Sequence, residues 1–279
     1  MLVNTKEMLL EAYNKGYALP SPDFVDVNSM RAYLEVAEEL NVPALLAISE
    51  GLSSCFPIDE AFVMGKYLAE KASVPVALHI DHGKHVDFVK KAIDIGYTSV
   101  MIDGSADPFD LNVQKTREIV EYAHKRNVTV EAEIGHVGSG INYEEDSGPG
   151  DTAVYTEVDD LVRFVELTGV DSVAVSVGTA HGLYVGVPKI NYERLEELHK
   201  AVNIPLVLHG GSSTGDENLR NCCGRGVAKI NIFTDISRAA AKAINEGNYD
   251  NYRDMIINGR PAMKEVLDHY YHVFKCLER

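Results

Sequence analysis

The stretch Val74–Asp103 reads VPVALHIDHGKHVDFVKKAIDIGYTSVMID, and it shows the unit from which the rest of the chain is built. An apolar, β-branched run (VPVALHID) is followed by a helical segment and then by a second such run (SVMID). Nearly continuous apolar strands that alternate with helices are typical of a parallel sheet covered by helices. The further runs are Ala44–Ser49 (ALLAIS), Val128–Ile134 (VTVEAEI), Ser172–Val177 (SVAVSV), Pro205–Gly210 (PLVLHG), Val227–Ile232 (VAKINI) and a weaker one near Tyr17–Phe24.

Eight strand–helix units within about 230 residues favour a closed (β/α)₈ barrel, a TIM barrel, over an open sheet. We therefore expect one α/β domain over residues 1–279, with a C-terminal helical extension at about 248–279. Asn4 and Glu7, three residues apart, predict a capping box for the first helix. The Gly- and acid-rich stretch Gly135–Thr156 interrupts the alternation of strands and helices after the fifth strand. Loops of this length inside a compact domain are usually functional or disordered.

The composition argues against several classes of protein. The 279 residues include 26 Lys and Arg against 42 Asp and Glu, for a net charge of −16. Such an acidic chain is a poor partner for nucleic acid or for an anionic membrane. The four cysteines form no CxxC pair, which favours free thiols in a reducing cytosol. The sequence shows neither a signal peptide nor a run of about 18 apolar residues, so we expect a cytoplasmic protein.

Polar side chains follow the predicted strands at their C-terminal ends, which converge on one face of a (β/α)₈ barrel. His82, His181 and His209 follow the third, sixth and seventh strands. Three neutral imidazoles and an open fourth position form a catalytic zinc site, so we predict that these three bind one metal ion. We interpret His79, inside its strand, as a packed or supporting residue. Six others are interpreted as surface residues: His85, His124, His136, His199, His269 and His272.

Carboxylates also lie at these strand ends. Asp81 adjoins His82 and is a candidate proton-transfer group, with the cap of the following helix as the alternative. Asp103 could accept a hydrogen bond from a ligating imidazole or bind the metal itself. Glu131 and Glu133 share one strand face, and two carboxylates that enter a barrel need partners. Lys229 could pair with one of them.

Glycine-rich turns follow the sixth and seventh strands, as GTAHG at Gly178–Gly182 and HGGSS at His209–Ser213. Free backbone N–H groups at such turns bind anions, and barrels often hold a phosphate near strands seven and eight. Asn231 and Thr234 follow the eighth strand, where a helix is expected to begin near Thr234. These turns therefore predict a phosphate site.

Six motifs occur in order between residues 78 and 235, within a resemblance that runs from KEMLLEAYNKGYALP to GRPAMKEVL: LHIDHG, SVMIDGS, VEAEIG, GTAHGLY, PLVLHGGSS and KINIFTD. In these motifs the chain resembles the class II, metal-dependent aldolase family, which includes fructose-1,6-bisphosphate and tagatose-1,6-bisphosphate aldolases. The resemblance implies cleavage of a phosphorylated ketose to dihydroxyacetone phosphate and an aldehyde such as glyceraldehyde 3-phosphate. It also implies catalytic Zn²⁺ in place of a Schiff-base lysine, and a homodimer or homotetramer.

The resemblance assigns the three histidines, His82, His181 and His209, to the zinc ion. It implies that Asp103 and Glu133 lie near the metal and can hold it in a resting position. Asp81 would be the acid/base that serves the C4 hydroxyl when the C3–C4 bond breaks.

Further residues would contact the substrate. Ser49, at the end of the second strand, matches a position that often carries a substrate-contacting hydroxyl, and Asn231 would also steady the enediolate. Gly182 and Gly210 would offer carbonyls to a monovalent cation, Na⁺ or K⁺. The dihydroxyacetone phosphate half would be held by Gly211, Ser212, Asn231 and Thr234.

The family usually protonates the enediolate with a glutamate shortly after a Gly-Gly pair. The corresponding stretch here, 138–141, reads GSGI, and carboxylates follow only at Glu144 and Glu145. We name Glu145 as the candidate loop acid, with Glu144 as the alternative.

Other departures affect phosphate recognition. Val185 stands where many members have a phosphate-binding lysine, and Asp23 replaces an asparagine common in the first strand. Phe233 occupies a position that tunes substrate choice. Arg260 could reach the distal phosphate of a neighbouring subunit's substrate, as a matching arginine does in some relatives.

The sequence thus predicts a cytosolic zinc aldolase that acts on a phosphorylated ketose. The alternatives are a class II aldolase with another substrate, such as a deoxy-ketogluconate phosphate, and a non-catalytic barrel that binds a metal or a sugar phosphate. Schiff-base chemistry at Lys229 is a further rival. A barrel-type zinc hydrolase is disfavoured because the first strand lacks an HxH pair.

Overall fold

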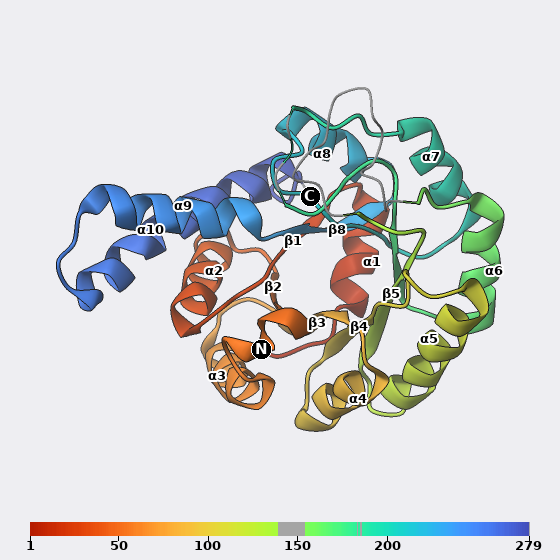
Figure 1. Ribbon diagram of the computed structural model, residues 1–279, viewed down its shortest axis with the longest axis horizontal. Coiled ribbons are helices and arrows are strands. Elements are labelled where there is room, and N and C mark those ends of the chain that lie inside the picture. Colours follow the sequence, from red (N-terminus) through yellow and green to blue (C-terminus); the bar gives the residue numbers. More distant parts are fainter. Residues whose placement is uncertain (139–153, 183, 185, 279) are drawn as a thin grey trace.

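The computed structural model describes residues 1–138, 154–182, 184 and 186–278. Strands and helices alternate around a barrel, as predicted (Figure 1). The strands are β1 (Leu19–Pro22), β2 (Ala44–Ser49), β3 (Val76–Gly83), β4 (Ser99–Ile102), β5 (Thr129–Ile134), β6 (Ser172–Val175), β7 (Leu206–Leu208) and β8 (Val227–Ile232). The helices are α1 (Lys6–Lys15), α2 (Val27–Leu40), η1 (Glu50–Ser54, a 3₁₀ helix), α3 (Ile58–Lys71), α4 (Val86–Ile95), α5 (Phe109–His124), α6 (Val158–Thr168), α7 (Tyr192–Ala201), α8 (Asp216–Cys223), α9 (Thr234–Gly247) and α10 (Tyr252–Val273).

The sheet is parallel throughout, in the order β1-β8-β7-β6-β5-β4-β3-β2. A parallel bridge between Asp23 and Ala47 joins the two ends of this order, and the amide of Phe24 donates to the carbonyl of Ala47 at 2.8 Å. The (β/α)₈ fold class is therefore confirmed. All C-terminal strand ends open on the same face of the barrel, which is where TIM-barrel active sites lie.

The strand boundaries lie within two residues of the predicted ones, because β-branched runs are strong local signals in a sheet buried on both sides. The predicted capping box is wrong. Thr5, not Asn4, is the N-cap of α1, and its side chain makes no capping bond. The Thr5 hydroxyl instead bonds to Thr129 at 2.7 Å and to Ser99 at 3.3 Å beneath the barrel, so buried tertiary contacts override the local motif.

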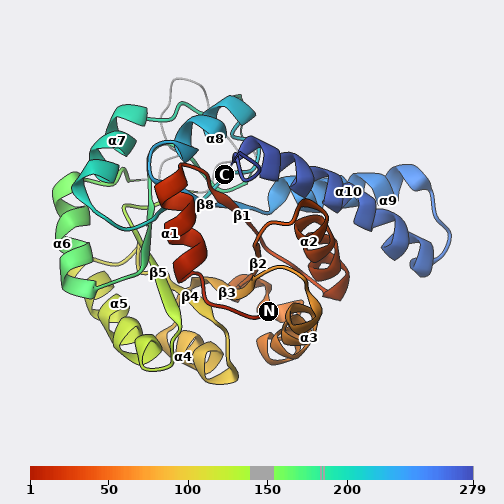
Figure 2. The same cartoon turned by 180° about the vertical axis from the view of Figure 1, so that it is seen from behind.

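The C-terminal extension begins earlier than residue 248. Helix α9 projects beyond the rim of the barrel, and α10 runs back alongside it, so that the two form a helical arm (Figures 1 and 2). The returning end of α10 packs against the barrel, where Tyr271 donates to the carbonyl of Pro43 at 3.0 Å. The arm is therefore anchored on the barrel at its base.

Two further sequence predictions concern the whole chain. All four cysteines are free thiols. Within the described residues, the search for a helix long and apolar enough to cross a membrane finds none.

Candidate functional site

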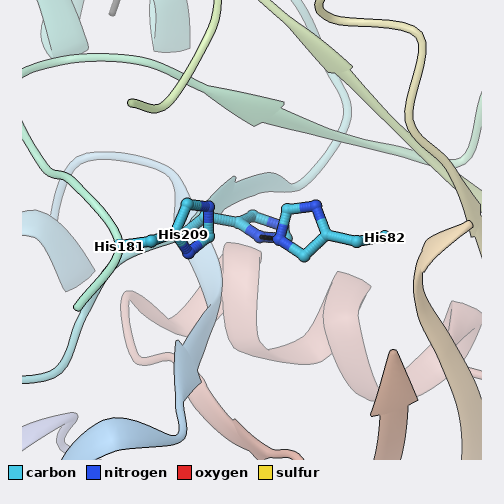
Figure 3. Close-up of side chains that lie close together, drawn as sticks. All are labelled: His82, His181 and His209. Carbon is cyan, nitrogen blue, oxygen red and sulfur yellow. Dashed lines mark hydrogen bonds between the residues drawn. The ribbon is translucent and has the colours of Figure 1, made fainter. Parts of the chain in front are cut away.

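Three histidines that lie far apart in the sequence converge at the open face of the barrel. The rings of His82, His181 and His209 point toward one another (Figure 3). The ring centroid of His82 lies 4.5 Å from that of His209 and 4.8 Å from that of His181. Each ring offers one nitrogen, and these three nitrogens lie within 4.8 Å of one another.

A bulge at the end of β3 brings two neighbouring side chains into the site. The register between β3 and β4 shifts between Ile80 and Gly83, and His82 adopts a positive φ of 43°. Consecutive residues of a regular strand point to opposite faces, whereas an extra residue in a bulge re-aims its side chain. Asp81 and His82 consequently line the same cavity.

We call this cavity, of about 220 Å³, the central cavity. It is lined by Ser21, Asp23, Ser49, Asp81, His82, His181, Gly182, Gly210, Ser212, Asn231, Ile232, Phe233 and Thr234. It adjoins a larger space of about 530 Å³, the outer hollow, with which it shares Ser49, His82 and His181. The outer hollow is further lined by Glu50, Gly51, Lys84, His85, Asp103, Glu133, His136 and Val137.

Buried carboxylates bind the remote nitrogens of two of the histidines. Nδ1 of His82 lies 2.9 Å from Asp103, and Nε2 of His209 lies 2.9 Å from Glu131. An ionised carboxylate only accepts hydrogen bonds, so these two ring nitrogens carry the protons. His82 Nε2 and His209 Nδ1 face each other at 2.8 Å, so that a proton on His82 Nε2 can be donated to His209 Nδ1, and a metal ion bound between the rings would take the place of this proton. Such carboxylate–imidazole pairs orient the ligands of metal sites.

Lys229 forms a buried ion pair with Glu131. Its Nζ lies 2.9 Å from one Glu131 oxygen and 3.0 Å from the other, and both side chains are about 1% exposed. The predicted pairing of Lys229 with one of the two β5 glutamates is confirmed, and the partner is Glu131. His79 is buried and bonds to the Ser99 hydroxyl at 2.8 Å, in agreement with its predicted supporting place.

The charges of the site favour a bound cation. Burial opposes a proton on His82, but Asp81 and the hydrogen bond to Asp103 outweigh it and raise the pKa of His82 to about 10. Burial lowers the pKa of His181 to about 3 and also lowers the pKa of His209. Both rings are therefore neutral, and each has a nitrogen lone pair that a metal ion can bind. Burial and the charge of Asp103 raise the pKa of Glu133 to about 8. This donor set fits a divalent ion with imidazole ligands.

Asp81 is held in place across the barrel. The amide of Asn231, which follows 150 positions later on β8, donates to Asp81 at 2.8 Å. Although burial raises the pKa of Asp81, the nearby His82 and His209 hold it below its ordinary value. Asp81 is therefore an oriented carboxylate beside the three converging histidines.

Asp23 lies in the same cavity, at the end of β1. It is 8% exposed, and its Oδ1 is buried with no hydrogen-bond partner in the described part of the chain. Burial and the charge of Asp81 raise its pKa well above the ordinary value. The cavity thus opposes a second negative charge beside Asp81.

The opposite side of the cavity carries the predicted phosphate-binding groups. Helix α9 begins at Thr234, as expected, with its positive N-terminal end at the cavity. The Ser212 hydroxyl accepts hydrogen bonds from the amides of Phe233 and Asp235 at 3.2 and 3.3 Å. The Gly211 amide bonds to the carbonyl of Asn231 at 3.1 Å, which fixes the turn against β8.

Gly210 occupies a turn that only glycine tolerates. Its φ is +69°, and a Cβ atom there would lie 2.4 Å from the carbonyl oxygen of Ala180. The Gly210 carbonyl accepts hydrogen bonds from the hydroxyls of Tyr184 at 2.9 Å and Thr214 at 2.8 Å. A monovalent cation at this carbonyl would have to share it with these two hydroxyls.

One residue interpreted as a surface histidine belongs to the site. His136 lines the outer hollow, where its Nδ1 bonds to Ser105 at 2.9 Å, and Ser105 in turn donates to Asp103 at 2.7 Å. In the sequence, the only indication that His136 belongs to the site was its position three residues after Glu133, a predicted site residue. His199 is also partly buried, edge-on against Tyr13. The surface interpretation was therefore wrong for these two residues, because both pack against neighbouring elements.

One predicted residue, Arg260, lies away from the central cavity within this chain. Arg260 lies on α10, where its guanidinium bonds to Asn28 at 2.8 Å and to Glu35 at 3.1 Å. Glu145 and its alternative Glu144 lie outside the described residues, as does Val185.

The fold and the site are those of a TIM-barrel aldolase. A family model described as "Fructose-bisphosphate aldolase class-II" matches residues 3–279. The YdjI aldolase from Escherichia coli K12 is 31% identical, with a TM-score of 0.88 over 98% of this chain and 97% of that one. A putative fructose-1,6-bisphosphate aldolase from Coccidioides immitis is 27% identical, with a TM-score of 0.87 over 96% of this chain and 95% of that one. The chain therefore belongs to the class II fructose-bisphosphate aldolase family.

A third structure shares the fold. The fructose-bisphosphate aldolase (Fba) from Campylobacter jejuni superposes with a TM-score of 0.82 at 23% identity, over 99% of this chain and 96% of that one.

Proposed function

We propose that this aldolase depends on Zn²⁺ and reversibly cleaves a phosphorylated ketose to dihydroxyacetone phosphate and an aldehyde. The observation that carries the proposal is the set of three converging imidazoles, two of which are fixed by carboxylates so that one nitrogen of each ring faces the other. His82, His181 and His209 would hold the ion. When bound, it would act as a Lewis acid that stabilises the negative charge developing on the ketone oxygen.

The residues around these histidines supply the remaining chemistry. Asp81, oriented by Asn231, would accept the proton of the C4 hydroxyl during cleavage and return it during condensation. Its lowered pKa keeps it ionised, so that an acceptor is available at this position. Asn231 would also hold the enediol oxygens of the triose half. Asp103 would position His82 through their hydrogen bond. Asp103 and Glu133, together with His82, would offer the ion an alternative resting place, since one ligand atom of each lies within 4.8 Å of the others.

The phosphate of the triose half would bind at the start of α9. Ser212 and Thr234 line this end of the cavity, where the dipole of α9 favours an anion. Gly211 stays a predicted contact of the phosphate, although it is not one of the lining residues and its amide bonds to Asn231. Ser49 on β2 and the carbonyls of Gly182 and Gly210 complete the substrate-binding surface; a Na⁺ or K⁺ ion at the two carbonyls stays a prediction.

Schiff-base catalysis at Lys229 is disfavoured by its position. Lys229 is buried beneath Glu131 and lines neither the central cavity nor the outer hollow. Its Nζ is bound to both oxygens of Glu131 and faces neither space in which a substrate could lie.

Two parts of the proposal concern groups beyond the cavity. The first is a homodimer or homotetramer in which Arg260 reaches the substrate of a neighbouring subunit. For this, the Arg260 side chain would have to release its hydrogen bonds to Asn28 and Glu35. Glu145 stays our candidate for the acid that protonates the triose half.

The proposal is tested by a screen of ketose monophosphates and bisphosphates, with triose phosphate release as the readout. We expect cleavage that a chelator abolishes and added Zn²⁺ restores. Activity that survives complete metal removal would refute metal dependence. Binding of dihydroxyacetone phosphate with no cleavage or condensation of any partner tested would instead support the non-catalytic alternative.

A further inference from the structure

The two ends of the central cavity differ in the charge that they can accept. The end near β7, β8 and α9 offers amides and a helix N-terminus to one phosphate. The opposite wall is formed by Asp23, Ser49 and Asp81, from β1, β2 and β3. The part of a ketose beyond the cleaved bond would have to lie along this second wall, because Asp81 serves the hydroxyl next to that bond.

Among the described residues, the central cavity has no lysine or arginine in its lining. The outer hollow has one lysine, Lys84, against three carboxylates, Glu50, Asp103 and Glu133. Glu50 already binds the amide of Lys84 at 2.7 Å and the ring of His85 at 2.6 Å. A second phosphate would therefore meet a surplus of negative charge.

Asp23 carries the inference because its carboxyl group has unused hydrogen-bonding capacity at a buried position. Its carboxyl group lines the cavity, and its Oδ1 has no hydrogen-bond partner in the described part of the chain. A sugar hydroxyl can donate to it, whereas a phosphate dianion cannot. Asp81 lies in the same wall, and its negative charge would further oppose a phosphate placed beside Asp23.

We propose that Asp23 is a specificity-determining residue that accepts a hydrogen bond from a hydroxyl of the distal half and excludes a distal phosphate. The preferred substrate is then a ketose 1-phosphate with an uncharged, hydroxylated tail. This inference rests on the proposed aldolase function, which it narrows.

The test is condensation of dihydroxyacetone phosphate with two aldehydes that differ only in a phosphate, glyceraldehyde and glyceraldehyde 3-phosphate, each as the racemate. The wild-type enzyme should show the higher kcat/KM with glyceraldehyde. Asp23→Asn keeps the size of the side chain and removes its charge. It should shift the kcat/KM ratio toward glyceraldehyde 3-phosphate by about tenfold or more, the order expected for one partly desolvated charge pair.

The matched control is Asp59→Asn, which removes one exposed negative charge from the first turn of α3, outside both spaces, and should leave the ratio unchanged. Asp23→Ser serves as a second variant if Asp23→Asn is inactive, and should shift the ratio in the same direction. A wild-type preference for the phosphorylated aldehyde, or an unchanged ratio in an active Asp23 variant, would overturn the inference. Absence of condensation with every aldehyde by the wild type would instead count against the proposed function itself.

Discussion

Tyr270 on α10 donates a hydrogen bond to Asp235 on α9 at 2.5 Å, and the same carboxylate receives the amide and the hydroxyl of Ser213, both at 2.7 Å. Ser213 has a positive φ of 59° and follows Ser212 in the predicted phosphate-binding turn. The helical arm is thereby linked to the turn through one buried carboxylate.

This link predicts a binding defect from a change outside the cavity. Tyr270→Phe should raise the KM for dihydroxyacetone phosphate by about fivefold with little change in kcat, because one lost hydrogen bond amounts to about 1 kcal/mol. Tyr271→Phe is the matched control, since it removes an equivalent buried bond, to Pro43, that does not touch the turn. Equal KM values in the two variants would show that the link has no positioning role.

The metal-ligand assignment is tested by His181→Ala. We expect this variant to lose both stoichiometric zinc, measured by elemental analysis, and cleavage activity, because two imidazoles are too few for a stable catalytic zinc site. His85→Ala changes an exposed ring and should retain both. Full zinc content in the His181 variant would refute its assignment as a ligand.

Asp81→Asn separates proton transfer from metal binding. The amide preserves the shape of the side chain but cannot accept the hydroxyl proton, so cleavage should fall by about 10²–10⁴-fold while zinc content is unchanged. The measurement is kcat for ketose cleavage together with metal analysis of the same sample. An undiminished rate would remove Asp81 from its proposed role.

The hydrogen bond between His82 and Asp103 should strengthen metal binding. Asp103→Ala is expected to weaken zinc affinity by about 10–100-fold, the usual effect of removing a carboxylate that orients a ligating histidine. Competition with a metal-binding dye measures the affinity. Asp107→Ala, which breaks only a partly exposed pair with Lys115, should bind zinc as the wild type does.

Lys229 should be required for stability rather than for chemistry. Lys229→Met leaves Glu131 with an uncompensated buried charge and should lower the free energy of unfolding by about 3–5 kcal/mol in chelator-treated protein. The double variant Lys229→Met, Glu131→Gln should be more stable than Lys229→Met alone, because the remaining charge is removed. Urea denaturation measures both, and a double variant no more stable than the single one contradicts this account.

The sequence fell short where contacts join distant parts of the chain. It placed Asp81 and Asn231 at strand ends, but the bond between them crosses the barrel and has no local signal. It left open which β5 glutamate pairs with Lys229, since Glu131 and Glu133 share one face and only the register of β8 distinguishes them. His136 was missed because its surroundings, Ser105 and Asp103, lie on another element.

The sequence by itself determined the barrel, the strand boundaries to within two residues, and the three histidines at corresponding strand ends. These follow from local periodicity and from the rule that parallel strands end on one face. Only the tertiary structure decided that Asp81 and His82 share one cavity, since the β3 bulge that re-aims them forms against β4. The tertiary structure also decided that Asp23 and Asp81 line one wall of the central cavity, because β1 and β3 are brought together only when the barrel closes between β1 and β2. Among the described residues, this wall contains no lysine or arginine.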